Sequence, residues 1–405
     1  YFVTEVSESD FKKELDEAQN ATPVDIYVER LAAKVTLRVD NDKLVPVDGK
    51  PGIYKVKVTV AGDPNQQEQG TQTGAADIYV RFLGWGGLNA TAKDSYIVKN
   101  IETAWSDADL GFVWNDAVWF RSYWGKSYNY GKQDGKYPDV SAEAAVAEYL
   151  NYINADKLTK QFGQSAYCAE NSNTSEIVSE YLHSAVTSIL LKAQILDENE
   201  QPLEMIRYNG TLYKRNDYLN YVLNTLQKGN KLNLYCLEDE ATGKYVQIDH
   251  NCVELANDRD GKVYLKLKPL AAGTSLYRKS GETYAPATDT ELGEVEKNMK
   301  DFNAYNEAIG YKDGLMYYNI PIEHLNNAAT TTDAENKRVI PVAKYGIVRN
   351  HHYVVTVNSL TKIGKGIFDP EEEIVPGKND EKDTYYVGAR INILSWKIVN
   401  QNVNL

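Results

Sequence analysis

The sequence has few cysteines and no long hydrophobic run, and each shortage excludes a class of protein. Its 405 residues contain three cysteines, none of them in a C-x-x-C pair, so a zinc ribbon or a thioredoxin-like redox site is not expected. No run of about 18 apolar residues occurs, so no membrane-spanning helix is predicted. P-loop and G-x-S-x-G motifs are absent. We therefore expect neither an enzyme nor a cofactor, and a secreted hydrolase built on two carboxylates is only a third alternative.

Basic charge is also scarce. Lysine and arginine number 44 against 57 aspartates and glutamates, which gives a net charge of −13. A nucleic-acid groove needs a clustered basic surface, and docking to an anionic lipid leaflet needs the same. We therefore exclude nucleic acid and membrane surfaces as partners.

The five histidines do not have metal-ligand spacing. His351 and His352 are adjacent in a strand pattern, so their side chains point to opposite faces and cannot chelate one ion together. The D-R-D-G stretch at 258–261 begins like a calcium loop but lacks the later ligands, and it is more typical of a hairpin turn. No metal site is expected.

What the sequence does contain is many short strand patterns separated by turns. Hydrophobic residues make up 42% and charged residues 25%, as in soluble proteins with a buried core. Strands are expected at 22–40, 52–62, 75–85, 187–197, 314–325, 344–360 and 387–396, and helices at 141–158 and 293–310. Because there is no βαβ rhythm, the pattern predicts a mainly β protein, an antiparallel β-sandwich or barrel with a few helical insertions.

The expected organisation has one large domain with flanking segments. Residues 1–20 are predicted to be a connector and 21–365 the sandwich, which includes an inserted loop at 105–137 and the helical segment 141–158. A polar loop at 366–384, a final core strand at 385–396 and a tail at 397–405 follow.

Aromatic residues are unevenly distributed. The chain has 30 tyrosines and only eight phenylalanines, and tyrosine suits the half-buried surface of a sheet. The 105–137 loop concentrates large rings at Trp105, Trp114, Trp119, Tyr123 and Trp124. These rings could pin the loop onto the sandwich, or they could stack on sugars in a cell-surface glycan-binding adhesin.

Cys236 and Cys252 flank the stretch YCLEDEATGKYVQIDHNC, which has the pattern of a strand, a turn and a strand. The two thiols could form a disulfide across this hairpin, or they could be two buried free cysteines. The sequence leaves both alternatives open.

The chain ends in a strand pattern with no partner strand after it. In V-N-Q-N-V-N-L, the apolar residues alternate with asparagine. A single strand needs a sheet edge, so it can pair within its own domain, lie on the surface or complete the sheet of a neighbour. The residues available as a donor strand are Val399, Asn400, Gln401, Asn402, Val403, Asn404 and Leu405.

Several blocks resemble one known family. They are KYGIVRNHHYVVTVNSLTKIGKG, YYVGARINILSWKIVNQNVNL, TPVDIYVERLAAKV, WNDAVWFRSYWGKSYNY, AYCAENSNTS and GLMYYNIPIEHL. Together they resemble the Bacteroidales fimbrillin family, especially the major subunits of its minor (short) fimbriae, over about residues 20–405.

The resemblance implies a transthyretin/Ig-like β-sandwich and a structural role in a type V pilus. Such subunits are exported as lipoproteins, trimmed by an arginine-specific protease and polymerised by strand exchange, in which the C-terminal strand fills a groove in the N-terminal domain of the next subunit. The implied partners are further copies of the chain, anchor and tip fimbrial proteins, and host or bacterial surface receptors. The implied location is an extracellular fimbria attached to the outer membrane.

The chain departs from the family pattern at its start. It has no lipobox cysteine and no N-terminal sandwich before residue 20, so we expect Tyr1 to begin a fragment. The acceptor groove would then lie outside this sequence. Arg30 could be the processing residue, although its surroundings have the pattern of an interior strand.

Overall fold

The computed structural model describes residues 6–22, 30–61, 73–93, 150–172, 177–178, 186–239, 241–257, 262–270, 274–302, 308–324, 331–334, 338–341, 344–367, 370–371, 373–374 and 397–404. The predicted aromatic loop at 105–137 and the predicted core strand at 385–396 lie outside these residues. So do the first half of the predicted helix at 141–158 and most of the polar loop at 366–384.

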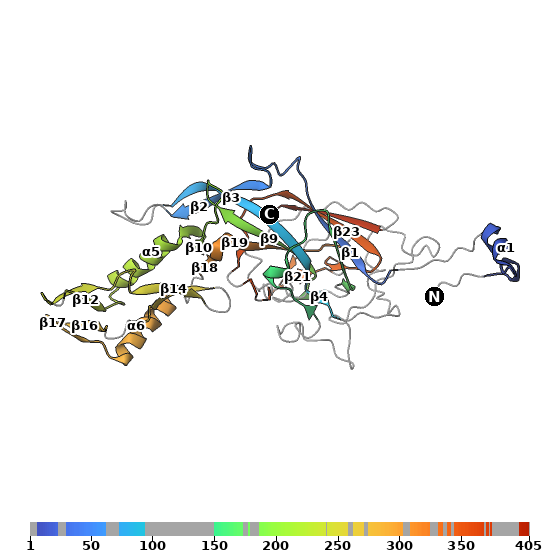
Figure 1. The fold of residues 1–405 in the computed structure, drawn as a ribbon. Helices are drawn as coiled ribbons and strands as arrows, with labels where there is room; N and C mark the ends of the chain where they lie inside the picture. The colour runs from blue at the N-terminus through green and yellow to red at the C-terminus, as the bar shows by residue number, and fades with distance from the viewer. Residues whose placement is uncertain are drawn as a thin grey trace.

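Two sheets form the centre of the elongated molecule (Figure 1). The larger sheet has the strand order β18 (Ile309–Tyr311), β10 (Met205–Tyr208), β11 (Thr211–Lys214), β2 (Ile53–Ala61), β3 (Thr73–Asn89), β9 (Ser188–Leu196), β19 (Leu315–Pro321) and β24 (Lys365–Gly366). The smaller sheet has the order β25 (Lys397–Asn404), β23 (His351–Ser359), β1 (Ala33–Val39) and β6 (Ser165–Cys168). Side chains of both sheets meet in one core, which includes Leu37, Val80, Leu191 and Val355.

The mainly β sandwich that the sequence predicts is therefore confirmed, but its sheets are mixed. In the smaller sheet β1 runs parallel to β23, and β23 runs parallel to β25. Parallel neighbours require long crossover connections, and local alternation of residues does not reveal them. The expectation of an antiparallel arrangement holds for most pairs of the larger sheet, including β2 with β3 and β9 with β19.

The apolar sequence of strand β9 explains its burial in the core. Every residue from Ser188 to Leu191 is buried, and β9 is hydrogen-bonded to β3 on one side and β19 on the other. A strand covered on both faces needs a nearly continuous apolar run. The stretch TSILLKAQILD at 187–197, which has almost no charge, supplies this run, so its prediction as a buried strand is confirmed.

Two glycines allow β24 to lie against its neighbours. A Cβ atom on Gly364 would lie 2.4 Å from the Tyr317 carbonyl oxygen, and one on Gly366 would lie 2.1 Å from that of Gly310. Both distances are too short for a side chain. Tyr311 donates its hydroxyl to the Gly364 carbonyl oxygen at 3.0 Å. The G-K-G spacing is therefore a packing requirement, and a buried tyrosine fixes the segment.

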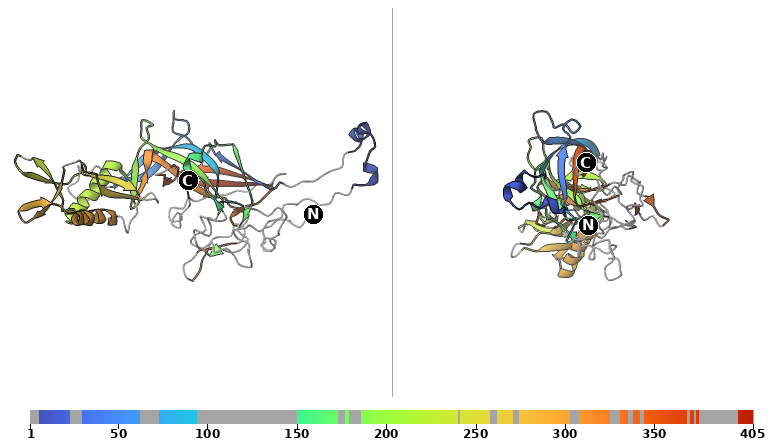
Figure 2. Two further views of the ribbon diagram at one scale, coloured as in Figure 1. Left: turned by 60° about the horizontal axis from the view of Figure 1, so that its bottom comes forward. Right: turned by 90° about the vertical axis from the view of Figure 1, so that its right-hand side faces the viewer.

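A distal lobe extends from one end of the sandwich, at the left of Figure 1, and the left-hand view of Figure 2 shows it projecting beyond the sheets. It contains α5 (Arg215–Lys228), α6 (Asp289–Asp301), β12 (Tyr235–Asp239), β13 (Lys244–Gln247), β14 (Val253–Asn257), β15 (Val263–Leu267), β16 (Leu276–Ser280) and β17 (Thr283–Pro286). A second core fills it, with Tyr218, Val222, Leu226 and Met299 among its members.

Helix α5 is not among the predicted elements, because the sequence predicted helices only at 141–158 and 293–310. Its buried residues Tyr218, Leu219, Val222, Leu223 and Leu226 repeat at helical spacing. The period was present in RNDYLNYVLNTLQK, but strand patterns on both sides obscured it.

Helix α6 also differs from its prediction of 293–310, since it begins at Asp289 and ends at Asp301. Thr288 and Glu291 form a capping box there, in which each side chain satisfies a backbone N–H of the first turn. This cap sets the earlier start.

The remaining elements are short. They are η1 (Glu8–Asp10), α1 (Leu15–Asn20), β4 (Thr91–Ala92), β5 (Leu150–Asn151), η3 (Ala155–Lys157), β7 (Asn171–Ser172), β8 (Ile177–Val178), β20 (Thr331–Thr332), β21 (Arg338–Ile340), η4 (Lys312–Gly314) and β22 (Gly346–Ile347). The described end of the predicted helix at 141–158 is β5 and η3, not α-helix. Among the helices in the described ranges, none has the length and apolar character needed to cross a bilayer.

Candidate assembly site at the terminal strand

The C-terminal strand β25 lies at the edge of the smaller sheet and pairs with β23 of its own chain. The ladder is parallel, with His351 opposite Lys397, and it continues to Ser359 opposite Asn404. Val399 lies opposite Tyr353, and Val403 lies opposite Val357. Of the three fates that the sequence leaves open, the single chain therefore shows pairing within its own sheet for the donor residues up to Asn404. Leu405 lies outside the described residues. A lone strand is unstable in water, which explains why this one uses the nearest edge.

Strand β23, the neighbour of β25, has one face that is buried throughout. His351, Tyr353, Val355 and Val357 on this face are buried, whereas His352 on the other face is half-buried and Val354 is 6% exposed. This confirms that His351 and His352 point to opposite faces. The Nε2 atom of His352 lies 2.9 Å from the Thr36 Oγ1 on β1, so the side chain ties β23 to its other neighbour.

A buried ion pair fixes the turn that leads into β23. Arg349 Nε donates to Glu170 Oε2 at 2.7 Å, and the two side chains are only 3% and 2% exposed. The Arg349 carbonyl oxygen lies 2.8 Å from His351 Nδ1. Two charges withdrawn from water must stay paired, because an isolated one is very costly. The start of β23 is therefore held in one place.

Tyr353 and His324 extend this polar cluster into the core. The Tyr353 hydroxyl accepts a hydrogen bond from the Val348 backbone N–H at 2.8 Å and lies 2.8 Å from His324 Nδ1. Burial raises the pKa of Tyr353 well above its ordinary value, so the phenol stays neutral. The sequence drew attention to R-N-H-H-Y only as a family-like block; it gave no reason to join it with Glu170 or His324.

The other predicted site residues are dispersed. Arg30 is exposed, in irregular structure just before β1, so the expectation of an interior strand does not hold at this position; its processing role stays a prediction. Trp105, Trp114, Trp119, Tyr123 and Trp124 lie outside the described residues. Cys236 and Cys252 lie together in the distal lobe, with their sulfur atoms 3.0 Å apart.

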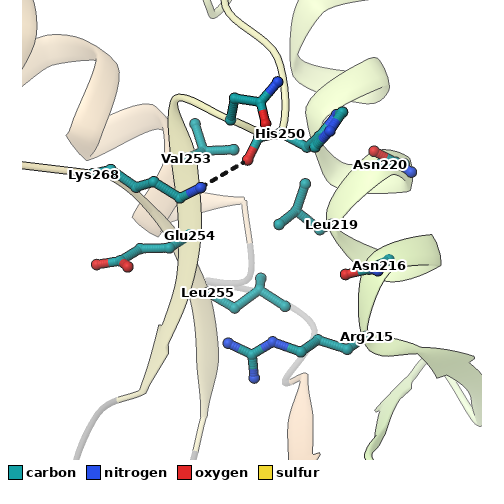
Figure 3. Close-up of a pocket in the computed structure, with 10 residues that line it drawn as sticks. Arg215, Asn216, Leu219, Asn220, His250, Val253, Glu254, Leu255 and Lys268 are labelled. Carbon is teal, nitrogen blue, oxygen red and sulfur yellow. Dashed lines mark hydrogen bonds between the residues drawn. The ribbon is translucent and has the colours of Figure 1, made fainter.

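The distal lobe also contains a cavity of about 410 Å³ between α5 and β14 (Figure 3). Arg215 and Asn216 line it from the helix, and His250 and Lys268 line it from the opposite side. The charged groups already have partners: Arg215 pairs with Glu204 at 2.6 Å, and Lys268 donates to the His250 carbonyl oxygen at 3.2 Å. The lining residues include no serine, threonine or cysteine.

Residues 310–402 match the family model described as Fimbrillin_C, "Major fimbrial subunit protein type IV, Fimbrillin, C-terminal". This part of the chain, which runs from β18 almost to the end of β25, is therefore similar to the C-terminal region of fimbrillins, which are structural subunits of fimbriae. A comparison with curated proteins finds no match.

Proposed function

We propose that this chain is a shaft subunit of a type V fimbria and that it polymerises by donor-strand exchange, with β25 as the donor. The observation that carries the proposal is the position of β25: it is the last described element of the chain and an edge strand with one neighbour in its sheet. Its partners would be further copies of the chain, anchor and tip proteins and surface receptors, in a fimbria attached to the outer membrane.

Departure of β25 requires breaking only one ladder. Strand β1, by contrast, is held between β23 and β6, so its removal would split the sheet. Re-pairing of β25 with an edge in a neighbouring subunit would restore the same backbone hydrogen bonds. Exchange is therefore close to balanced in hydrogen bonding, and the fit of apolar side chains in the new groove decides its direction.

Two acceptors are compatible with this chemistry. One is the edge of β23 in a second copy, vacated by that copy's own β25. The other is the groove of an N-terminal domain, which the family resemblance implies. The second contact joins the end of one subunit to a different domain of the next, and such head-to-tail contacts make filaments. Exchange into β23 makes a filament only when it runs in one direction along the copies, because reciprocal exchange between two copies closes a dimer.

The test uses matched charge substitutions along the tail. V399D/V403D places two carboxylates at the apolar positions, whereas N400D/N402D adds the same charge at the alternate positions. Burying one apolar side chain is worth about 1.5–3 kcal/mol, so we expect the first variant to lose the ladder of polymers on an unheated denaturing gel and the second to keep it.

Deletion of 399–405 provides the second arm of the test. Circular dichroism should show that the truncated monomer keeps its strands, while its ladder disappears. Equal ladders from the truncated and intact chains would overturn the donor role, because β25 would then serve only its own sheet.

The glycan-binding alternative stays a prediction. It rests on Trp105, Trp114, Trp119, Tyr123 and Trp124, and none of the described contacts favours it. Quenching of tryptophan fluorescence by added sugars would test it independently of polymerisation.

A further inference from the structure

We propose that Cys236 and Cys252 are a cross-linking site and that they form a disulfide joining the outermost sheet of the distal lobe to the hairpin β14–β15. Cys236 lies in β12, and Cys252 lies in the turn immediately before β14, which belongs to a different sheet. Their sulfur atoms are in contact at 3.0 Å. Both thiols are free in this structure, so the disulfide would add a side-chain link between the two sheets to the backbone that already connects them.

The backbone holds both residues in this facing position. Cys236 is paired with Val246 and Leu276 in its sheet, and Leu276 is 3% exposed in the core of the lobe. Cys236 therefore shares the face that looks inward. Adjacent residues of a strand point to opposite faces of the sheet, so the neighbouring Tyr235 lies on the other face.

The turn before β14 positions the second thiol. The Cys252 backbone N–H donates to the Asp249 carbonyl oxygen at 3.0 Å, and its own carbonyl oxygen accepts from the Lys268 N–H at 2.9 Å. The Asp249 carboxylate accepts from the Asn251 N–H at 2.8 Å. Because these bonds fix the turn, little reorganisation is needed to bring the sulfur atoms to bonding distance.

The chemistry is thiol–disulfide exchange with an external disulfide, from a protein or a small molecule, as the oxidant. The Cys252 thiolate attacks one sulfur of the oxidant and releases its other sulfur as a thiolate. Cys236 loses its proton and attacks Cys252, which closes the protein disulfide and releases the second thiolate. The two cysteines together lose two protons and two electrons, and the oxidant becomes two thiols.

The order of the two attacks follows from the surroundings. Burial raises the pKa of Cys236 to about 12, with a further contribution from the hydrogen bond to Cys252. Cys236 is therefore a poor first nucleophile in water. It becomes effective once Cys252 carries the mixed disulfide, because the sulfur it attacks is then already in contact.

Cys168 provides a matched comparison. It lies in β6 and packs against the sandwich core, whereas the other two cysteines pack against the core of the lobe. Burial raises the pKa of the Cys168 thiol as well. The chain contains no fourth cysteine, so Cys168 should stay reduced when the pair is oxidised.

The experiment treats the folded full chain with oxidised glutathione, blocks the remaining thiols with an alkylating reagent under denaturing conditions and maps the peptides by mass spectrometry. We expect one alkylated residue, Cys168, and one cross-linked pair of peptides that contains Cys236 and Cys252. C168A should give the same cross-link. Alkylation of all three cysteines of the folded wild-type chain, or a cross-link through Cys168, would overturn the proposal.

Thermal unfolding then tests the structural effect. The cross-link closes a short loop and restricts the unfolded chain, so the oxidised wild-type lobe should melt higher than the reduced lobe by on the order of 5 °C. A reductant should abolish this difference and should leave C236S unchanged. The peptide map is made on the wild-type chain, so a folding defect in C236S would not affect it. A melting temperature that a mapped cross-link does not raise would show that the lobe is not stabilised by it and would overturn the joining role.

Discussion

The sandwich and the distal lobe are parts of one chain that fold by different kinds of contact. The sandwich joins strands that are remote in sequence, such as β1 at Ala33–Val39 and β23 at His351–Ser359. The fully buried residues of the lobe core all fall between Ile206 and Ala308. Local contacts cost less loop-closure entropy than remote ones. The lobe is therefore an insertion that can form its own core, whereas the sandwich requires almost the whole chain.

This difference indicates that polymerisation depends on the sandwich and not on the lobe. The fimbrillin match begins at residue 310, just after the lobe, and it ends within β25. The terminal strand and its neighbour β23 both belong to the sandwich. We infer that changes in the sandwich should affect polymerisation and that changes in the lobe should leave it intact. The substitutions below test this inference, in order of decreasing effect.

The largest effect is expected from Arg349→Met in the sandwich. The substitution removes the positively charged partner of the buried Glu170 carboxylate beside the start of β23, and breaking a buried pair in this way costs about 3–5 kcal/mol. Denaturant unfolding should show this loss, and polymer formation should fall with it.

Arg215→Met is the matched control, because the Arg215–Glu204 pair is 42% and 37% exposed. It should cost less than about 1 kcal/mol. Similar losses from both substitutions would mean that burial does not distinguish the two pairs.

Leu223→Ala should destabilise the lobe and spare assembly. Leu223 is 5% exposed in the second core, and removing a buried leucine side chain costs about 2–5 kcal/mol. Hydrogen exchange should increase in α5 and α6 but not in β23, and the polymer ladder should match that of the wild type. Asn224→Ala, at an exposed position on the same helix, should change neither. Loss of the ladder in Leu223→Ala would show that the two regions are coupled.

The sequence predicts the sandwich better than it predicts the lobe. Alternation identifies β2, which turns one face to a core, and a nearly continuous apolar run identifies β9, which is buried on both faces. Strand β23 lies within the strand predicted at 344–360. Helix α5 was missed although its period is clear, since strands surround it on both sides in the sequence. Propensity is a weak guide where packing of short segments decides their structure.

The candidate site could be predicted only in part. The alternating tail marked β25 as a strand, and its backbone confirms the pattern as far as Asn404. Its partner strand, and the parallel direction, could not be read from the sequence because they depend on a crossover. The association of Glu170 with Arg349 spans 179 positions, and no local pattern reveals a contact of that range.

The smallest effect concerns the pH dependence of the sandwich. Burial lowers the pKa of His352, and Lys34 and Arg38 on β1 lower it further; Lys34 lies directly opposite it. The folded state therefore favours the neutral imidazole, whereas the unfolded chain takes up a proton below its ordinary pKa of about 6.5. Stability is fully present above that pH and falls as the pH drops toward the folded pKa.

His352→Gln removes this titration and keeps a side chain able to hydrogen-bond with Thr36. We expect the wild-type sandwich to lose more stability than the variant between about pH 7.5 and pH 5.5, as measured by its denaturant midpoint. The loss should be smaller than that caused by Arg349→Met, because His352 is only half-buried. Hydrogen exchange in α5 should show no difference between the two proteins, since His352 lies outside the lobe. Identical pH profiles for the wild type and His352→Gln would mean that protonated His352 is tolerated beside Lys34. The comparison of sandwich and lobe would then depend on the buried Arg349–Glu170 pair alone.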